Sequence, residues 1–120
     1  MNHECRYDIQ GLTDELEVEL KDIVRLFSNY FEEMQSEMSE MEKFLSQKDW
    51  VMLQRVAHNI KGVSANLGIQ DVFSEAAAFD AMLKAGITES AVQYVNGIKT
   101  LLKNANAEVD AYFSQHGLTL

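Results

Sequence analysis

Apolar residues recur along almost the whole chain at alternating steps of three and four positions. This spacing places them on one face of an α-helix, and its sustained repetition is typical of helices that pack side by side. The sequence offers no stretch in which apolar and polar residues alternate with the period of two expected of a β-strand. The pattern therefore predicts an all-α fold.

The first apolar stripe extends from Leu16 to Leu45. Thr13, which acidic residues follow, has the side chain of a helix N-cap, so we expect the first long helix to begin just after it. The periodicity is equally consistent with one long helix and with a short helix followed by a long one. The fold prediction therefore allows for a short extra helix near the N-terminus.

Three further helices are predicted, over about residues 50–67, 71–84 and 89–115. Asp49 and Thr88 offer N-cap side chains for the first and the last of them. Gly68 is expected to be the C-cap that ends the first, since glycine readily adopts the left-handed conformation found there. Four helices joined by short turns predict an antiparallel up-down four-helix bundle.

Composition agrees with a single domain over residues 1–120. The chain is 47% hydrophobic and long enough to bury one core, and no apolar run approaches the roughly 18 residues of a membrane-spanning helix. The N-terminus lacks a signal-peptide pattern, and Cys5 is the only cysteine, so an internal disulfide is excluded. We therefore expect a cytoplasmic monomer with no membrane association.

The net charge of −9 argues against nucleic-acid binding. Residues 1–50 hold 13 acidic and 5 basic residues, whereas the remainder is almost neutral. The sequence has neither the Glu-x-x-His pairs of a metal-binding bundle nor a glycine-rich nucleotide motif, so no metal, no cofactor and no kinase activity are predicted. His3 and His116 lie in the terminal segments and are expected to be surface residues.

His58 differs from these two histidines because it lies within a predicted helix. At about 100° per residue, it points about 170° away from the centre of the apolar stripe on that helix. Lys61, Gly62 and Ala65 follow on the same face. A lone exposed histidine is usually a surface residue, but glycine in a helix interior costs roughly 1 kcal/mol relative to alanine. We interpret this bare surface as room for another molecule to approach the imidazole.

The segment HNIKGVSANLG, from His58 to Gly68, resembles the H-x-[IL]-K-G-x-[SA]-x-x-[LF]-G signature of histidine-containing phosphotransfer (HPt) domains. The preceding residues, SQKDWVMLQRVAH, are also similar to the family's approach to its motif. Members of the family are four-helix bundles of about this length, so the resemblance covers nearly the whole chain. It implies that His58 carries a phosphoryl group between aspartates of receiver domains, and that Lys61 helps to hold the phosphoryl oxygens.

The resemblance also implies roles for the residues around the histidine. Many family members place Gln or Glu on the following helix, where it hydrogen-bonds the imidazole; the corresponding residue here is Asp80, whose side chain is one methylene shorter. Asp80 would orient the imidazole if it reaches, and would otherwise be a solvated acid beside Lys84. Four residues are assigned to partner docking: Gln54, Arg55, Gly62 and Ala65.

The sequence thus predicts a phosphoryl carrier rather than an enzyme, acting in a multistep two-component phosphorelay. Its expected partners are a response-regulator receiver domain and a hybrid sensor histidine kinase. The alternative is an HPt-like bundle that binds a kinase or receiver as a regulator without accepting phosphate. A third interpretation, a segment of a larger hybrid kinase, is disfavoured by Met1 and the uncharged tail.

Overall fold

The computed structural model describes residues 5–120, so the prediction for His3 lies outside the described residues. The regular secondary structure of this part of the chain is all helical, as predicted, and contains no strand. Its five helices are α1 (Ile9–Glu15), α2 (Leu20–Ser46), α3 (Trp50–Asn66), α4 (Gln70–Lys84) and α5 (Ala91–Gln115).

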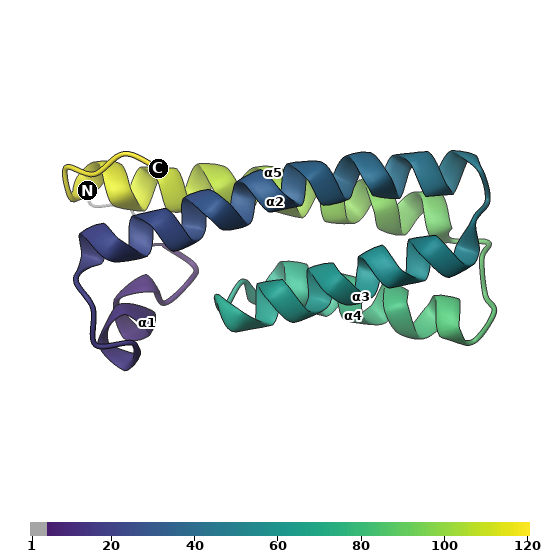
Figure 1. Cartoon of the computed structure of the whole chain (residues 1–120), viewed down its shortest axis with the longest axis horizontal. Coiled ribbons are helices and arrows are strands. Elements are labelled where there is room, and N and C mark those ends of the chain that lie inside the picture. Colours follow the sequence, from purple (N-terminus) through teal and green to yellow (C-terminus); the bar gives the residue numbers. More distant parts are fainter. Residues whose placement is uncertain (1–4) are drawn as a thin grey trace.

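The four long helices pack in a ring around one core (Figure 1). Helix α2 contacts α3 and α5, and α4 contacts the same two helices from the other side. Three-residue turns join α2 to α3 and α3 to α4, and consecutive helices run in opposite directions in Figure 1. The short α1 packs against α2 near one end of the molecule. In this arrangement one flank of α3 packs against α4 and the other against α2.

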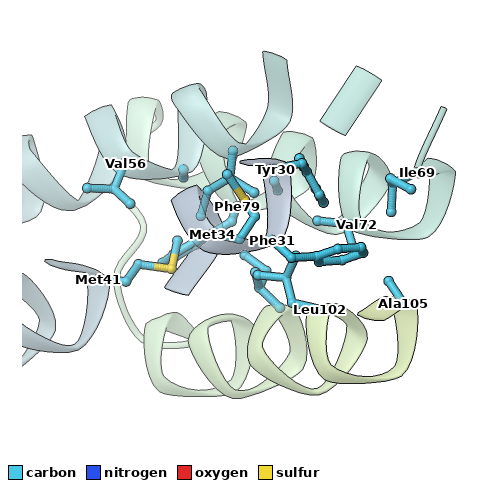
Figure 2. Packing of buried hydrophobic residues seen from close by; sticks show 14 of the residues in the cluster. Tyr30, Phe31, Met34, Met41, Val56, Ile69, Val72, Phe79, Leu102 and Ala105 are labelled. Atoms are coloured by element: carbon cyan, nitrogen blue, oxygen red, sulfur yellow. The ribbon is translucent and has the colours of Figure 1, made fainter. Parts of the chain in front are cut away.

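Large apolar side chains fill the space between the helices (Figure 2). Phe27 on α2 meets Phe113 on α5 edge to face, with 5.8 Å between ring centroids, and Phe79 on α4 stacks on Tyr94 at 5.3 Å. Aromatic pairs at these separations contribute beyond the area that they bury. The core therefore ties all three of these helices together.

The buried face of α3 is rotated relative to the predicted stripe. Ala57 and Ser64 are fully buried, whereas Val63 and Leu67 are only half-buried. Ser64 can be buried because its hydroxyl oxygen lies 2.7 Å from that of Tyr30, which satisfies both polar groups. The rotation brings one flank of the predicted exposed face toward α4.

The prediction that Thr13 caps the first long helix is wrong. Thr13 lies inside α1, is 3% exposed, and donates its hydroxyl proton to the carbonyl oxygen of Ile9 at 2.7 Å. Helix α2 begins at Leu20 instead, where Glu19 and Asp22 form a reciprocal capping box. The single apolar stripe thus spans two helices, and Leu16, at the end of α1, is exposed.

The ends of the later helices agree more closely with the sequence. Asp49 caps α3 as predicted, because its carboxylate accepts a hydrogen bond from the backbone N–H of Met52 at 3.2 Å. The prediction for Thr88 is wrong: α5 begins at Ala91, and it is the backbone carbonyl of Thr88 that accepts from the Ala91 N–H. A turn between Thr88 and Ala91 therefore precedes α5, which begins later in the sequence than predicted.

Gly68 occupies the left-handed region after α3, with φ +71°. The N–H of Ile69 donates to the carbonyl of Ser64 at 3.0 Å, and the N–H of Gly68 donates to that of Ala65 at 3.2 Å. This pair of hydrogen bonds is a Schellman motif, which satisfies the last carbonyls of a helix. The tight reversal returns the chain alongside α3 and so brings residues of α4 within reach of His58.

Candidate functional site

His58 lies in the middle of α3, and 60% of its side chain is exposed. The helix surface one turn further on is bare, because a Cβ added at Gly62 would meet no atom within 4 Å. Ala65 is exposed as well. The imidazole thus stands beside open helix surface, as the sequence predicted.

Asp80 reaches His58 from α4. Its Oδ2 atom lies 3.0 Å from Nδ1 of the imidazole, and its side chain is 2% exposed. The shorter side chain can reach because α4 packs against α3. The aspartate is therefore a buried partner of the histidine and not a solvated acid.

Three more side chains hold the Asp80 carboxylate. Gln54 donates from Nε2 to Oδ1, while Nζ of Lys84 lies 3.3 Å and Nζ of Lys61 3.6 Å from Oδ2. Burial raises the pKa of Asp80, but hydrogen bonds from Gln54, His58 and Lys84 outweigh it and bring the pKa down to about 2. Asp80 is consequently ionised at neutral pH.

The ionised Asp80 fixes the imidazole tautomer. A carboxylate has no proton to donate, so Nδ1 of His58 must be the donor in the contact with Oδ2. In the neutral ring the other nitrogen, Nε2, then keeps its lone pair. The site thus presents a nucleophilic nitrogen on an exposed side chain.

Lys61 and Lys84 differ in exposure but share a target. Their side chains are 34% and 56% exposed, respectively, and both approach the same oxygen of Asp80. Long exposed lysine side chains can redirect their ammonium groups over several ångströms. From the sequence, Lys84 is identified only as a neighbour of Asp80. Its position four residues after Asp80 on the same helix is the signal that places it near the site.

Acidic residues of α2 lie near Asn59 of α3. Asn59, next to His58, donates a hydrogen bond to Glu37 on α2. Burial raises the pKa of Glu37, and the nearby charges of Glu33 and Glu40 raise it further, whereas the hydrogen bond lowers it. Asn59 of α3 thus lies near carboxylates of α2, whereas Lys61 and Lys84 lie beside Asp80.

The four residues assigned to docking occupy different surroundings. Gln54 is half-buried and bonded to Asp80, so it belongs to the polar cluster beneath the imidazole. Arg55, Gly62 and Ala65 are exposed. Val51, which was not singled out from the sequence, is 71% exposed and lies seven residues before His58, on the same face of α3.

Other features predicted from the sequence lie away from this cluster. His116 is exposed at the end of α5, with Nδ1 2.8 Å from the carbonyl oxygen of Tyr112. Among residues 5–120, no three His, Cys, Asp or Glu side chains are placed to hold a metal ion. None of the helices in the described part of the chain has the length and apolarity that a bilayer crossing demands.

Comparison with protein families places the site in context. The family model described as the Hpt domain matches residues 25–111, which include α3, α4 and most of α2 and α5. The match begins after α1, so this short helix lies outside it. Neither the search of curated proteins nor the search of solved structures found a match.

Proposed function

The chain belongs to the Hpt domain family, and from that membership and the geometry at His58 we propose that it carries phosphoryl groups in a multistep two-component phosphorelay. Hpt domains are phosphocarrier modules of phosphorelays, where they interact with receiver and kinase domains. Our proposal is that His58 accepts the group from an aspartate of one receiver domain and passes it to an aspartate of another.

The observation that carries the proposal is the hydrogen bond from Nδ1 of His58 to the buried Asp80. It leaves Nε2 as the nucleophile on an exposed side chain. In the first transfer, the Nε2 lone pair attacks the phosphorus of a receiver's aspartyl phosphate. The N–P bond forms as the P–O bond breaks, and the electron pair of the broken bond stays on the receiver's carboxylate.

The surroundings of His58 suit this transfer. The phosphoryl group brings roughly two negative charges, and the ammonium groups of Lys61 and Lys84 are close enough to turn toward it. Phosphoryl transfer depends chiefly on positioning and charge neutralisation. The open surface at Gly62 lets the receiver bring its aspartate close to the imidazole.

A receiver domain phosphorylated on its aspartate provides the test. Mixing it with the protein should transfer an acid-labile, base-stable label to the chain, and His58→Gln should abolish that label. Retention of the label in His58→Gln would show that another residue is the acceptor. His116→Gln is a matched control because it removes an exposed histidine far along α5 and should leave labelling unchanged.

The remaining features follow from the same proposal. We take the four long helices as an antiparallel phosphotransfer bundle with α1 as an addition, within one domain that acts as a cytoplasmic monomer. A docking regulator that accepts no phosphate is the second candidate, favoured by the bare exposed face around Gly62. It predicts measurable receiver binding without any transfer in the wild-type protein.

A further inference from the structure

Asp80 carries a full negative charge at the one imidazole nitrogen that takes no phosphoryl group. An amide oxygen in its place would accept the same hydrogen bond, and an amide N–H could also donate to a ring nitrogen that had lost its proton. The carboxylate can only accept. The Asp80 carboxylate can therefore form a hydrogen bond with Nδ1 only when Nδ1 carries a proton.

Phosphorylation changes what happens to that proton. When Nε2 of a neutral imidazole attacks phosphorus, the ring becomes positively charged as long as Nδ1 keeps its proton. In water such a ring can shed the proton and become neutral. A fixed anion 3.0 Å from Nδ1, in a side chain that is 2% exposed, opposes this loss.

We propose that Asp80 holds the Nδ1 proton of His58 throughout the transfer cycle, so that the phosphoryl group enters and leaves without uptake or release of a proton. This inference rests on the proposed phosphocarrier function. On the outward transfer, a carboxylate of the next receiver attacks phosphorus, the N–P bond breaks, and its electron pair returns to Nε2. The ring is then neutral again, with its proton still on Nδ1.

The cluster around Asp80 supports this role as a positioning residue. Gln54 holds Oδ1, which directs Oδ2 at the imidazole. Lys84 and Lys61 compete for Oδ2 before phosphorylation, but their exposed side chains can move to the phosphoryl oxygens. Once the lysines have moved, Oδ2 of Asp80 would accept a hydrogen bond only from Nδ1 of the positively charged ring.

Among the hydrogen bonds and ion pairs of the described residues, the imidazole of His58 has Asp80 as its partner. On α2, Glu37 interacts with Asn59, on the opposite flank of α3 from Asp80. On α5, Tyr94 stacks on Phe79 of α4. Asp80 is thus the charged group that directly contacts Nδ1.

Phosphoramidate, a small-molecule phosphoryl donor, allows a test without any partner. Wild type, Asp80→Glu and Asp80→Gln are phosphorylated with it, and NMR of the imidazole nitrogens follows the Nδ1 proton from neutrality to about pH 9. The two variants match in size and differ in charge. We expect the proton to persist in wild type and Asp80→Glu and to be lost in Asp80→Gln.

The transfer equilibrium with one receiver gives a second readout. Loss of the Nδ1 proton stabilises the phosphorylated carrier. The equilibrium ratio of phosphorylated carrier to phosphorylated receiver should therefore rise with pH in Asp80→Gln relative to wild type, by up to about tenfold per pH unit where the proton is lost. A merely structural role would leave that ratio independent of pH. If neither variant folds, phosphorylated free histidine is the reference, and wild type must keep its Nδ1 proton to a higher pH.

Two results would overturn different claims. If the wild-type protein accepts and passes the group but loses its Nδ1 proton as readily as Asp80→Gln or free phosphohistidine, the inference fails and the proposed function stands. If neither phosphoramidate nor any phosphorylated receiver labels the wild-type protein, the proposed function fails, and this inference fails with it.

Discussion

Lys61 on α3 and Lys84 on α4 approach the same oxygen of Asp80, at 3.6 and 3.3 Å. Two ammonium groups from different helices therefore face one carboxylate beside the imidazole. The two lysines and Asp80 together carry a net charge of +1 before phosphoryl transfer. Such an excess would attract a doubly charged phosphoryl group more strongly than a balanced ion pair would.

This arrangement predicts that Lys84→Ala, like Lys61→Ala, slows phosphoryl transfer more than tenfold, or about 1.4 kcal/mol in activation free energy. Binding of an unphosphorylated receiver should weaken much less, because exposed ion pairs contribute about 0.2–1 kcal/mol. Single-turnover labelling gives the first quantity and titration the second. Lys99→Ala is the matched control, since Lys99 pairs with Glu42 away from the site. Equal losses in binding and in transfer would make these lysines docking residues only.

His58→Gln should remain as stable as wild type. The side chain is 60% exposed, and substitutions at exposed positions normally change the free energy of unfolding by less than about 0.5 kcal/mol. Urea unfolding followed by circular dichroism measures this difference. A much larger loss of stability would mean that the contact with Asp80 is chiefly structural.

Gly62→Ala should stabilise the protein by up to ~1 kcal/mol, because an added Cβ meets no atom within 4 Å and alanine favours the helix. Gly62→Gln should also fold, yet transfer phosphate poorly, because its side chain would project where the receiver approaches. Gly97→Ala offers a comparison within α5, where the nearest atom to a new Cβ is 3.8 Å away. It should gain stability without affecting transfer. Unimpaired transfer in Gly62→Gln would refute the close-approach argument.

The turn after α2 predicts a stabilising substitution far from the site. Lys48 has φ +54° and occupies the same position after α2 that Gly68 occupies after α3, with equivalent hydrogen bonds from Asp49 to Phe44 and from Lys48 to Leu45. A side chain in the left-handed region costs roughly 1–2 kcal/mol. Lys48→Gly should therefore raise the free energy of unfolding by about 1 kcal/mol, as measured by thermal or urea unfolding. A decrease would indicate that the lysine side chain stabilises the turn.

Acid should destabilise the protein partly through Asp80. Its pKa falls from 3.8 to about 2 on folding, so the ionised group stabilises the native state above the unfolded-state pKa. That contribution, of order 2 kcal/mol, is lost as pH falls through the range between these two values. Unfolding free energies measured from pH 5 to about pH 2 should fall more steeply in wild type than in Asp80→Asn. Parallel curves for the two proteins would contradict this role.

The repeating pattern predicted the helices well because burial of one face dominates their formation. Helix ends were less predictable. A threonine followed by acids looks like an N-cap, but Asp8 caps α1 earlier by accepting from the N–H of Gly11 at 2.9 Å, and this leaves Thr13 inside the helix. The spacing of apolar residues does not show which of two possible N-cap residues, here Asp8 and Thr13, begins the helix.

The site was predictable in its residues but not in its contacts. His58 and Lys61 belong to the motif, and Asp80 follows from the family's pattern on the next helix. Its reach, however, depends on how closely α4 packs against α3. Burial of Ser64, made possible by its partner Tyr30, rotates α3, and the sequence pattern gives a serine no reason to face the core. Lys84 lies at the site because α4, which also carries Asp80, packs against α3.

The helical turn of α3 around Gly62 has no bulky side chain over it, so its backbone beside His58 is accessible to water. Amide hydrogens in such a turn exchange with solvent more readily than those beneath bulky side chains, and a bound partner would shield them. Deuterium uptake around Gly62 and Ala65 therefore provides a footprint of docking that needs no phosphoryl group. Under the proposed function, it would detect a receiver bound over His58 whether or not the histidine carries a phosphoryl group.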